Sequence, residues 1–508
     1  MRLDRATTPA ATAVAALRGA QHRTGANYPA RLALLLTALG GSPPLEPADI
    51  PALVAATLDE IGLAPSDIIW LALAVISGSL PTSEEVTTVE RAVRLSGPAQ
   101  VLVAGAERTT PKTGRRTVRL VRDATLVDLG DLVSSPLGTG IQRVARNVTT
   151  EWLVRHSITI TAWTASFDAL RTVGEREGLV ALAGAQPTPG LEDDHARVPE
   201  PAEDVVVPWN CTYVLPELAV EPARCAATQA LAAFSRNRTA VIGFDCVPIT
   251  SPETSAQGFA GVFALNLAAV AHFDVVGAIS TAAAGEYEGW RRMLEGAGLP
   301  GPAIAAVGLP GFAPEADAEA MREAAATFLV PGLPLVLVVG SHEPRKNHLA
   351  VLHAAELLWR RGLCFSLTFI GGNSWGSDDF SARLNALQGA GRPVEAVSKL
   401  PDRLLWAAYR LARCTVFPSL NEGFGLPVAE SLSAGTPAIT SNFGSMREIA
   451  QGGGALLVDP RDDDDLAAAL ERVLTDDFLV ARLRAEAGAR PQETWSDYAE
   501  NLWELFHA

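Results

Sequence analysis

The sequence predicts an α/β protein with two doubly wound parallel-sheet domains that face a cleft, preceded by an all-helical domain. Three observations lead to this fold class. The chain has 508 residues and is 48% hydrophobic, which is enough for two or three cores of ordinary size. From residue 124 onward, short apolar runs of strand character alternate with runs of helical periodicity. A break rich in proline and glycine near Leu309 divides this alternation, so we expect two sheets.

The first hundred residues carry helical periodicity and no strand pattern. We therefore expect a helical domain over residues 1–105, followed by a basic, turn-rich linker over residues 106–123. Residues 68–80 are almost entirely apolar, but they are too few to span a bilayer, so a core helix is favoured over an interfacial membrane helix. The expected helices cover residues 11–17, 29–39, 48–61, 68–76 and 84–95.

The first predicted sheet domain covers residues 124–312. An acidic, proline-containing segment at 186–203 interrupts its alternation and is expected to be a surface loop. Strands are predicted at 124–129, 158–163, 204–208, 239–244 and 274–279, with helices at 141–155, 218–234 and 259–271.

The second predicted sheet domain covers residues 313–492. A last helix at 496–506, within residues 493–508, is expected to pack back onto the first sheet domain. Strands are predicted at 335–339, 364–370 and 414–417, with helices at 347–358, 402–411 and 466–474. The aspartates 462–465 resemble a metal-binding cluster, but they directly precede a helix, so capping is the favoured interpretation.

Composition limits the partners and the compartment. A formal net charge of −16 argues against nucleic-acid binding, although one or two local cations suffice for a phosphorylated small molecule. The five cysteines are scattered and predict neither a disulfide framework nor a zinc site. No signal-peptide core or spanning segment is recognised. We expect a cytoplasmic protein, with peripheral association at the inner face of the membrane as an alternative.

The segment from Asn421 to Glu430 joins a strand to a helix and carries two carboxylates eight positions apart. At such a junction the free amides and the helix dipole favour an anion, and Gly423 and Gly425 let the backbone approach it. Helical geometry would separate Glu422 from Glu430 by ~12 Å along the axis. This is wider than the roughly 5–9.5 Å of a glycosidase carboxylate pair. The two carboxylates are therefore expected to bind the two ends of one long ligand.

Arg345 and Lys346 follow an aliphatic strand and precede a helix, and Lys346 is one of only three lysines in the chain. Two cations beside a helix N-terminus oppose its dipole unless an anion lies between them. A solvated charged turn is the alternative interpretation, but the glycine-containing Glu422 loop favours an anion site, most simply for a diphosphate. An arginine can bind it bidentately, while a lysine acts as a point charge.

These segments resemble the retaining, nucleotide-sugar-dependent glycosyltransferases of family 4, which have the GT-B fold with two Rossmann-like domains. The resemblance is close over residues 334–473, looser over 128–308, and does not include the helical residues. It is carried by Glu343-Pro-Arg-Lys-Asn347, Pro418-Ser419, Glu422-x7-Glu430, Gly435-Thr-Pro437 and Thr440-Ser-Asn442.

The resemblance implies that Glu422 contacts the donor sugar, that Glu430 contacts the ribose, and that Arg345 and Lys346 hold the diphosphate. It implies no metal and no cofactor beyond the nucleotide sugar itself. The Glu-Pro-Arg-Lys-Asn form of the loop resembles mannosyltransferases, so GDP-mannose is the first donor expected, with a polysaccharide, lipid-linked or protein acceptor. Further donor contacts are expected from Gly423, Phe424, Gly425, Leu426 and Gly340.

Two candidate sites lie in the first sheet domain. Thr139 and Gly140 belong to a glycine turn that resembles the family's loop facing the diphosphate, although a purely structural turn is as good an interpretation. Trp209 and Asn210 follow a strand and are candidate acceptor contacts, with a packing tryptophan as the alternative.

Phe244 marks a departure from the family pattern, in which a histidine often precedes the aspartate of a His-Asp-x-x-Pro stretch. The resemblance implies that Asp245 remains as a polar group near the anomeric carbon, so it is a candidate catalytic residue together with Glu422, Arg345 and Lys346. In front-face retaining transfer the leaving phosphate itself takes the acceptor proton, so activity does not require the histidine. Two other functions remain open: a catalytically silent interaction or assembly subunit, suggested by Phe244 and the helical domain, and a GT-B nucleotide-sugar epimerase.

Overall fold

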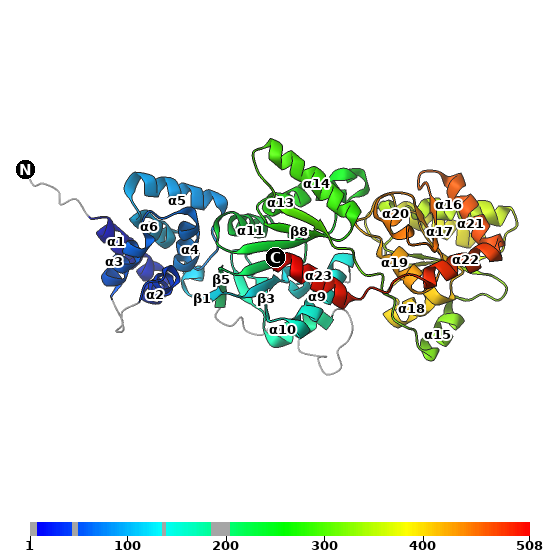
Figure 1. Cartoon of the computed structure of the whole chain (residues 1–508), viewed down its shortest axis with the longest axis horizontal. Coiled ribbons are helices and arrows are strands. Elements are labelled where there is room, and N and C mark those ends of the chain that lie inside the picture. The colour runs from blue at the N-terminus through cyan, green and yellow to red at the C-terminus, as the bar shows by residue number, and fades with distance from the viewer. Residues whose placement is uncertain (1–7, 43–48, 135–138, 184–203) are drawn as a thin grey trace, which may run out of the picture.

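The computed structural model describes residues 8–42, 49–134, 139–183 and 204–508. Helical elements, a first sheet and a second sheet follow one another along the longest axis of the molecule (Figure 1). The predicted acidic loop at 186–203 lies outside the described residues, as do Leu137 and Gly138 of the predicted glycine turn.

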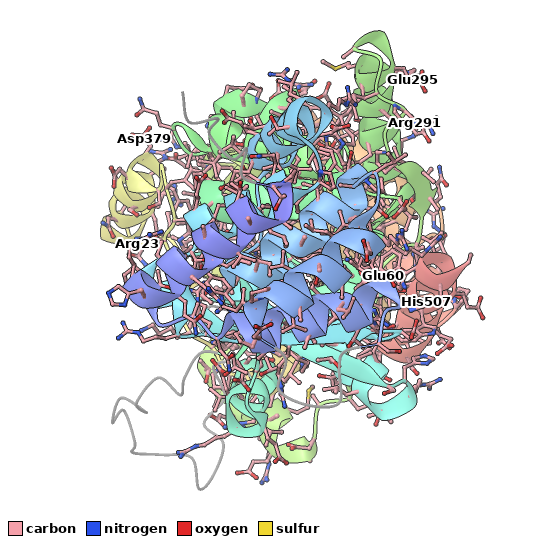
Figure 2. The ribbon with its side chains drawn as sticks, turned by 90° about the vertical axis from the view of Figure 1, so that its left-hand side faces the viewer. Arg23, Glu60, Arg291, Glu295, Asp379 and His507 are labelled. Atoms are coloured by element: carbon pink, nitrogen blue, oxygen red, sulfur yellow. The ribbon has the colours of Figure 1, made fainter. Side chains whose placement is uncertain are left out.

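Six helices pack together at the N-terminal end of the molecule, which faces the viewer in Figure 2. The central helix is α4, whose residues from Ile68 to Ser77 are all buried, so the predicted core helix is confirmed. The structure extends four of the predicted helices, begins the third at Ile50 and adds α6. The bounds are α1 (Pro9–Thr24), α2 (Tyr28–Leu39), α3 (Ile50–Ile61), α4 (Ser66–Ser77), α5 (Ser83–Ser96) and α6 (Ala99–Arg108).

Residues 106–123 do not form the predicted linker. They complete α6 and then form α7 (Pro111–Gly114) and β1 (Thr117–Arg122), which pairs in parallel with β5 (Asp204–Trp209). β1 mixes apolar and charged residues and has exposed and half-buried positions, as expected of a strand at the edge of a sheet. The buried apolar side chains of the helices and of the first sheet form one continuous cluster.

The first sheet has nine strands among the described residues, in the order β1-β5-β4-β3-β2-β6-β7-β8-β9. All neighbours pair in parallel except β4, which is antiparallel to β3 and β5. The remaining strands are β2 (Thr125–Asp128), β3 (Ile158–Trp163), β4 (Leu170–Thr172), β6 (Thr212–Leu215), β7 (Arg238–Gly243), β8 (Val275–Ala278) and β9 (Ala303–Ala306). The helices are α8 (Gly130–Ser134), α9 (Gly140–Arg155), α10 (Glu175–Ala183), α11 (Pro222–Phe234), α12 (Val247–Thr250), α13 (Phe259–Val270) and α14 (Thr281–Gly296), with a 3₁₀ turn at Pro252–Thr254.

The described part of the second sheet is fully parallel, with six strands in the order β12-β11-β10-β13-β14-β15. The order reverses between β10 and β13, which is the switch point of a doubly wound sheet. Its strands are β10 (Leu335–Val339), β11 (Ser366–Ile370), β12 (Val394–Val397), β13 (Cys414–Phe417), β14 (Ala438–Ser441) and β15 (Ala455–Val458). Its helices are α15 (Ala318–Phe328), α16 (His348–Arg360), α17 (Asp378–Gly389), α18 (Asp402–Leu411), α19 (Leu426–Ser433), α20 (Gly444–Ala450), α21 (Asp463–Thr475) and α22 (Asp477–Gly488), with a 3₁₀ turn at Pro344–Lys346.

The last helix, α23 (Trp495–His507), returns from the second sheet domain and lies beside α9 on the first (Figure 1). Trp152 of α9 donates its indole N–H to the carbonyl of Ala499 at 2.8 Å. Arg238 donates to the carbonyl of Phe506 at 2.6 Å, and the side chains of Thr125 and His507 lie 2.9 Å apart. The end of the chain is therefore fixed to the first sheet by polar contacts as well as by its buried apolar face.

Candidate active site

A cleft of about 1580 Å³ lies between the two sheet domains and is lined by residues of both. Arg345 and Lys346 come from the loop after β10, and Glu422 comes from the loop after β13. Because β10 and β13 are neighbours at the switch point, their carboxyl-end loops open onto the same side of the sheet. Two segments that are more than 70 positions apart in the chain are brought together in this way.

Arg345, Lys346 and Glu422 form a compact charged cluster on the floor of the cleft. The carboxylate of Glu422 lies 2.5 Å from the guanidinium of Arg345 and 2.5 Å from the ammonium of Lys346. Arg345 also pairs with Glu343 at 2.8 Å and donates to the carbonyl of Asn421 at 2.9 Å. The two cations are therefore held at fixed positions before any ligand binds.

The pKa shifts of this cluster show how strongly its charges are coupled. Burial alone would raise the pKa of Glu422, but Arg345 and Lys346 outweigh it and lower that pKa to about 2. Burial lowers the pKa of Lys346, and Glu422 offsets this effect only in part. Burial also acts to lower the pKa of Arg345, but Glu422 and Glu343 prevail and raise it. Glu422 is thus ionised throughout the physiological range.

Two helix N-termini face the same cleft from opposite domains. Gly140 begins α9, and the side chain of Thr139 accepts a hydrogen bond from the amide of Gln142 at 3.3 Å. In the second domain, Gly425 precedes α19 with φ of 106°, a conformation that disfavours any residue with a Cβ. The cleft therefore combines two cations with two positive helix ends, which together suit a polyanionic group. Gly340, Gly423, Phe424 and Leu426 also line it.

Glu430 lies deeper in the cleft, on α19, where it is buried. It accepts a hydrogen bond from the hydroxyl of Tyr409 at 3.0 Å and forms an ion pair with Arg143 of α9. Burial raises the pKa of Glu430, while Arg143 and Tyr409 act against that rise.

Arg143 was not predicted as a site residue. Its guanidinium also lies over the ring of Trp406, 5.3 Å from the ring centroid, so it contacts the second domain twice. The signal was present in the sequence, since a cation in the first turn of a helix opposes the dipole and calls for an anionic partner.

Asp245 follows β7 and lines the cleft beside Phe244. Its carboxylate accepts a hydrogen bond from the amide of Val247 at 3.0 Å. Burial raises the pKa of Asp245 to about 6, against the lowering influence of Arg345. Phe244, in the position expected for a histidine, is buried and also lines the cleft.

The two domains touch directly at Gly423. A Cβ built on Gly423 would lie 2.2 Å from the carbonyl oxygen of Phe244, so only glycine permits this approach. Ser280 donates its hydroxyl to the carbonyl of Gly423 at 2.5 Å. Nearby, Glu448 of α20 accepts the amides of Thr281 and Ala282 at the start of α14, at 3.0 and 3.1 Å. The cleft is therefore closed along this edge.

Trp209 and Asn210 do not lie where an acceptor contact was expected. Neither lines the cleft, and Trp209 is 1% exposed with the guanidinium of Arg236 5.0 Å from its ring centroid. The reason is that the chain does not leave the sheet at the end of β5. Asn210 adopts φ of 55°, and the chain continues at once into β6.

Asp462 confirms the capping interpretation, because its carboxylate accepts the amides of Asp464 and Asp465. Within the described ranges, no group of three or more histidine, cysteine or acidic side chains is arranged to hold a metal ion. None of the helices that the structure describes has the length and apolarity needed to cross a membrane.

Comparison with known proteins shows what the second domain is similar to. Residues 322–490 match the protein family described as glycosyl transferases group 1. The chain is 27% identical to the serotype-specific mannosyltransferase WbdA of Escherichia coli over 343 residues, covering 64% of this chain and 40% of that protein. It is 34% identical to the O-antigen chain mannosyltransferase B of Escherichia coli over 164 residues, covering 32% of this chain and 42% of that protein. The chain thus spans about two fifths of the length of these curated relatives.

Solved structures resemble most of the chain. Sucrose-phosphate synthase from Thermosynechococcus elongatus has a TM-score of 0.52 at 16% identity, covering 76% of this chain and 98% of that one. Anabaena Alr3699/HepE in complex with UDP and glucose has a TM-score of 0.54 at 12% identity, covering 76% of this chain and 99% of that one. The predicted GT-B fold and the resemblance to GT-B glycosyltransferases are confirmed, whereas the family 4 subgroup stays a prediction.

Proposed function

We propose that this GT-B chain, whose residues 322–490 form a glycosyl transferases group 1 domain, is a retaining hexosyltransferase that uses a nucleotide sugar. One observation carries the proposal. Arg345 and Lys346 converge with Glu422 in a cleft where two helix N-termini meet, an arrangement suited to a diphosphate with a sugar attached.

The chemistry follows from the charges. Transfer of the sugar leaves negative charge on the departing diphosphate, and fixed donors aimed at that charge are usually the largest catalytic contribution. Arg345 can bind two phosphate oxygens, while Lys346 supplies a compact charge. As the diphosphate takes over these cations, Glu422 becomes available to accept hydrogen bonds from the sugar hydroxyls, and Glu430 can do the same for the ribose. The leaving phosphate takes the acceptor proton, and no metal is required.

GDP-mannose is the first donor proposed. The supporting observation is the similarity to two Escherichia coli proteins whose names describe mannosyltransferases. The name of the second describes action on an O-antigen chain, which favours a polysaccharide acceptor over a lipid-linked or protein acceptor. UDP-glucose is the second donor to test, because Alr3699/HepE was solved with UDP and glucose. We place the protein in the cytoplasm, either free or peripherally attached to the inner face of the membrane.

The test is a donor panel with two readouts. The full chain is titrated with GDP-mannose, UDP-glucose and UDP by calorimetry, and release of nucleoside diphosphate is followed with and without oligosaccharide acceptors. We expect one donor to bind and to be turned over, with the α-anomeric configuration of an α-linked donor kept in the product. Absence of binding to every donor would overturn the proposal. Donor binding without turnover would favour a silent subunit, and interconversion of the nucleotide sugar without acceptor would favour an epimerase.

A further inference from the structure

Helix α14 begins at the interface of the two sheet domains, and residues of both domains bind its first two turns. Ser280, the residue before the helix, donates its hydroxyl to the carbonyl of Gly423 at 2.5 Å. Further along the helix, Glu286 lies beside the segment that follows β7 and carries Asp245. Glu286 does not line the cleft, and the proposed function gives it no role.

The carboxylate of Glu286 holds both ends of the short helix that follows Asp245. Its Oε2 accepts the amide of Cys246 at 2.7 Å, and its Oε1 accepts the hydroxyl of Thr250 at 3.0 Å. Cys246 precedes α12 and Thr250 is its last residue. Asp245 in turn accepts the amide of Val247 at 3.0 Å. Glu286 therefore fixes the segment from which the side chain of Asp245 extends.

The same carboxylate is bound by the second domain through Asn421. The side-chain amide of Asn421 donates to Glu286 Oε1 at 3.3 Å and also lies 3.4 Å from the hydroxyl of Thr250. The carbonyl of Asn421 accepts a hydrogen bond from Arg345 at 2.9 Å. Because Asn421 directly precedes Glu422, this contact ties the loop of the sugar-binding carboxylate and its cation to α14.

Asp245 and the Glu422 loop touch each other across the interface. A Cβ built on Gly423 would lie 3.0 Å from Oδ2 of Asp245. Burial raises the pKa of Asp245, and the negative charge of Glu286 acts in the same direction, because the three donors that bind Glu286 are neutral. The titratable groups that face Asp245 come from both domains and are Arg345, Glu422, Glu286, Cys246 and Tyr287.

We infer that Glu286 is a positioning residue that fixes Asp245 against the Glu422 loop when the two domains are closed. One carboxylate outside the cleft holds the segment of Asp245 through Cys246 and the loop of Glu422 through Asn421. The inference rests on the proposed function. It adds the residue through which the approach of the domains sets the relative position of the two carboxylates proposed to act on the sugar.

The test compares three variants of the full chain. Glu286→Leu removes both acceptor oxygens, whereas Glu286→Gln keeps the shape and one acceptor oxygen but removes the charge. Glu288→Gln is the matched control, because it removes a carboxylate of the same helix that pairs with Arg291 at 3.2 Å. The measurements are kcat and KM for the donor, calorimetric binding of GDP and UDP, the pH profile of kcat/KM, and amide hydrogen exchange.

We expect Glu286→Leu to lower kcat roughly 10- to 150-fold, the equivalent of one lost hydrogen bond to a charged group. The fall should be smaller in Glu286→Gln, and Glu288→Gln should behave like the parent chain. Because Glu286 lies outside the cleft, KM for the donor and binding of GDP or UDP should not change. Unchanged kcat in Glu286→Leu would overturn the inference, as would a fall matched by equally weakened nucleotide binding.

The pH profile shows whether Glu286 acts through Asp245. In the parent chain kcat/KM should fall as the pH drops through 6, where Asp245 becomes protonated. Glu286→Gln removes a neighbouring negative charge, so this fall should move to a lower pH. A fall that stays at the same pH would overturn the inference, since a purely structural role leaves the pKa of Asp245 unchanged.

Amide hydrogen exchange of the ligand-free chain decides the inference without turnover. Glu286→Leu should speed exchange roughly 2- to 10-fold at residues 246–250 and at residues 420–424, because the carboxylate binds both segments. Glu288→Gln should change neither. Unchanged exchange in either segment of Glu286→Leu would overturn the inference. Absence of donor binding and turnover in the parent chain would overturn the proposed function instead.

Discussion

Replacing Gly423 by alanine tests whether closure of the two domains is required for activity. The new Cβ would lie 2.2 Å from the carbonyl oxygen of Phe244, and such contacts essentially never fall below 3.0 Å. Backbone atoms cannot rotate away as a side chain can, so the domains must separate at this edge. The clash crosses the domain interface, and the fold of each domain on its own does not depend on it.

The expected magnitude follows from the size of the clash. Overpacking by one methyl group costs about 1–3 kcal/mol. If this cost falls on the closed state alone, kcat/KM should fall roughly 5- to 160-fold, since 1.36 kcal/mol corresponds to a factor of ten. The melting temperature should change little.

The assay compares transfer kinetics with the melting temperature and with the radius of gyration from solution scattering. Gly389→Ala is the matched control, because a Cβ at the end of α17 meets nothing within 4 Å. We expect it to behave like the parent chain, whereas Gly423→Ala should be larger in solution as well as slower. Unchanged kcat/KM in Gly423→Ala would refute the role of this contact in catalysis.

Five further predictions concern the charged groups of the cleft and the need for a metal. Glu422→Ala leaves the buried Arg345 and Lys346 without their shared partner, so the melting temperature should fall. Because a nucleoside diphosphate then supplies the missing anion, the rise in melting temperature on adding it should exceed that of the parent chain. An equal rise would contradict this account. Glu430→Ala should weaken nucleotide binding roughly 10- to 150-fold by calorimetry, from the loss of hydrogen bonds to a charged group. Asp245 has a pKa raised to about 6, so a reaction that needs its ionised form should slow as the pH falls through 6, and Asp245→Asn should remove this dependence. The raised pKa also means that the folded state favours the protonated form of Asp245. The stabilisation from this protonated form is lost as the pH rises through 6, because the carboxyl then ionises inside the folded protein. Asp245→Asn stays neutral and should therefore raise the melting temperature at pH 8. Prolonged treatment with EDTA should leave transfer of the sugar unchanged. A loss of activity that Mg²⁺ restores would show that Arg345 and Lys346 do not suffice to stabilise the departing diphosphate.

Local patterns predicted the elements whose ends are marked by composition. The strands Ile158–Trp163 and Cys414–Phe417 and the helix Asp402–Leu411 have the predicted bounds. Pro401, Arg413 and Pro418 mark the ends of the last two, and small hydroxyl residues, Ser157 and Thr164, flank the first. The short strand β6 was missed, since it follows β5 after a kink at Asn210 and has no turn signal of its own. The same kink made the predicted position of Trp209 wrong. The apolar run that contains Trp209 ends there, but the chain continues into β6 and does not open into the cleft at that point.

The charged cluster around Arg345 and Glu422 was accessible from the sequence because both segments follow strands that a doubly wound sheet places side by side. For Arg143 the sequence could indicate only that this cation needs an anion, and not that the anion is Glu430 of the other domain, since that pairing depends on how far the two domains close.

The return of α23 to the first sheet means that the chain crosses between the sheet domains twice, at residues 307–317 and 489–494. A second covalent connection limits how far one domain can slide or twist against the other. The hydrogen bonds of α23 to Trp152 and Arg238 fix that connection to the first sheet domain. The helix therefore ties the domain that carries Glu430 to the sheet domain that carries Arg143 by more than the single chain segment at 307–317.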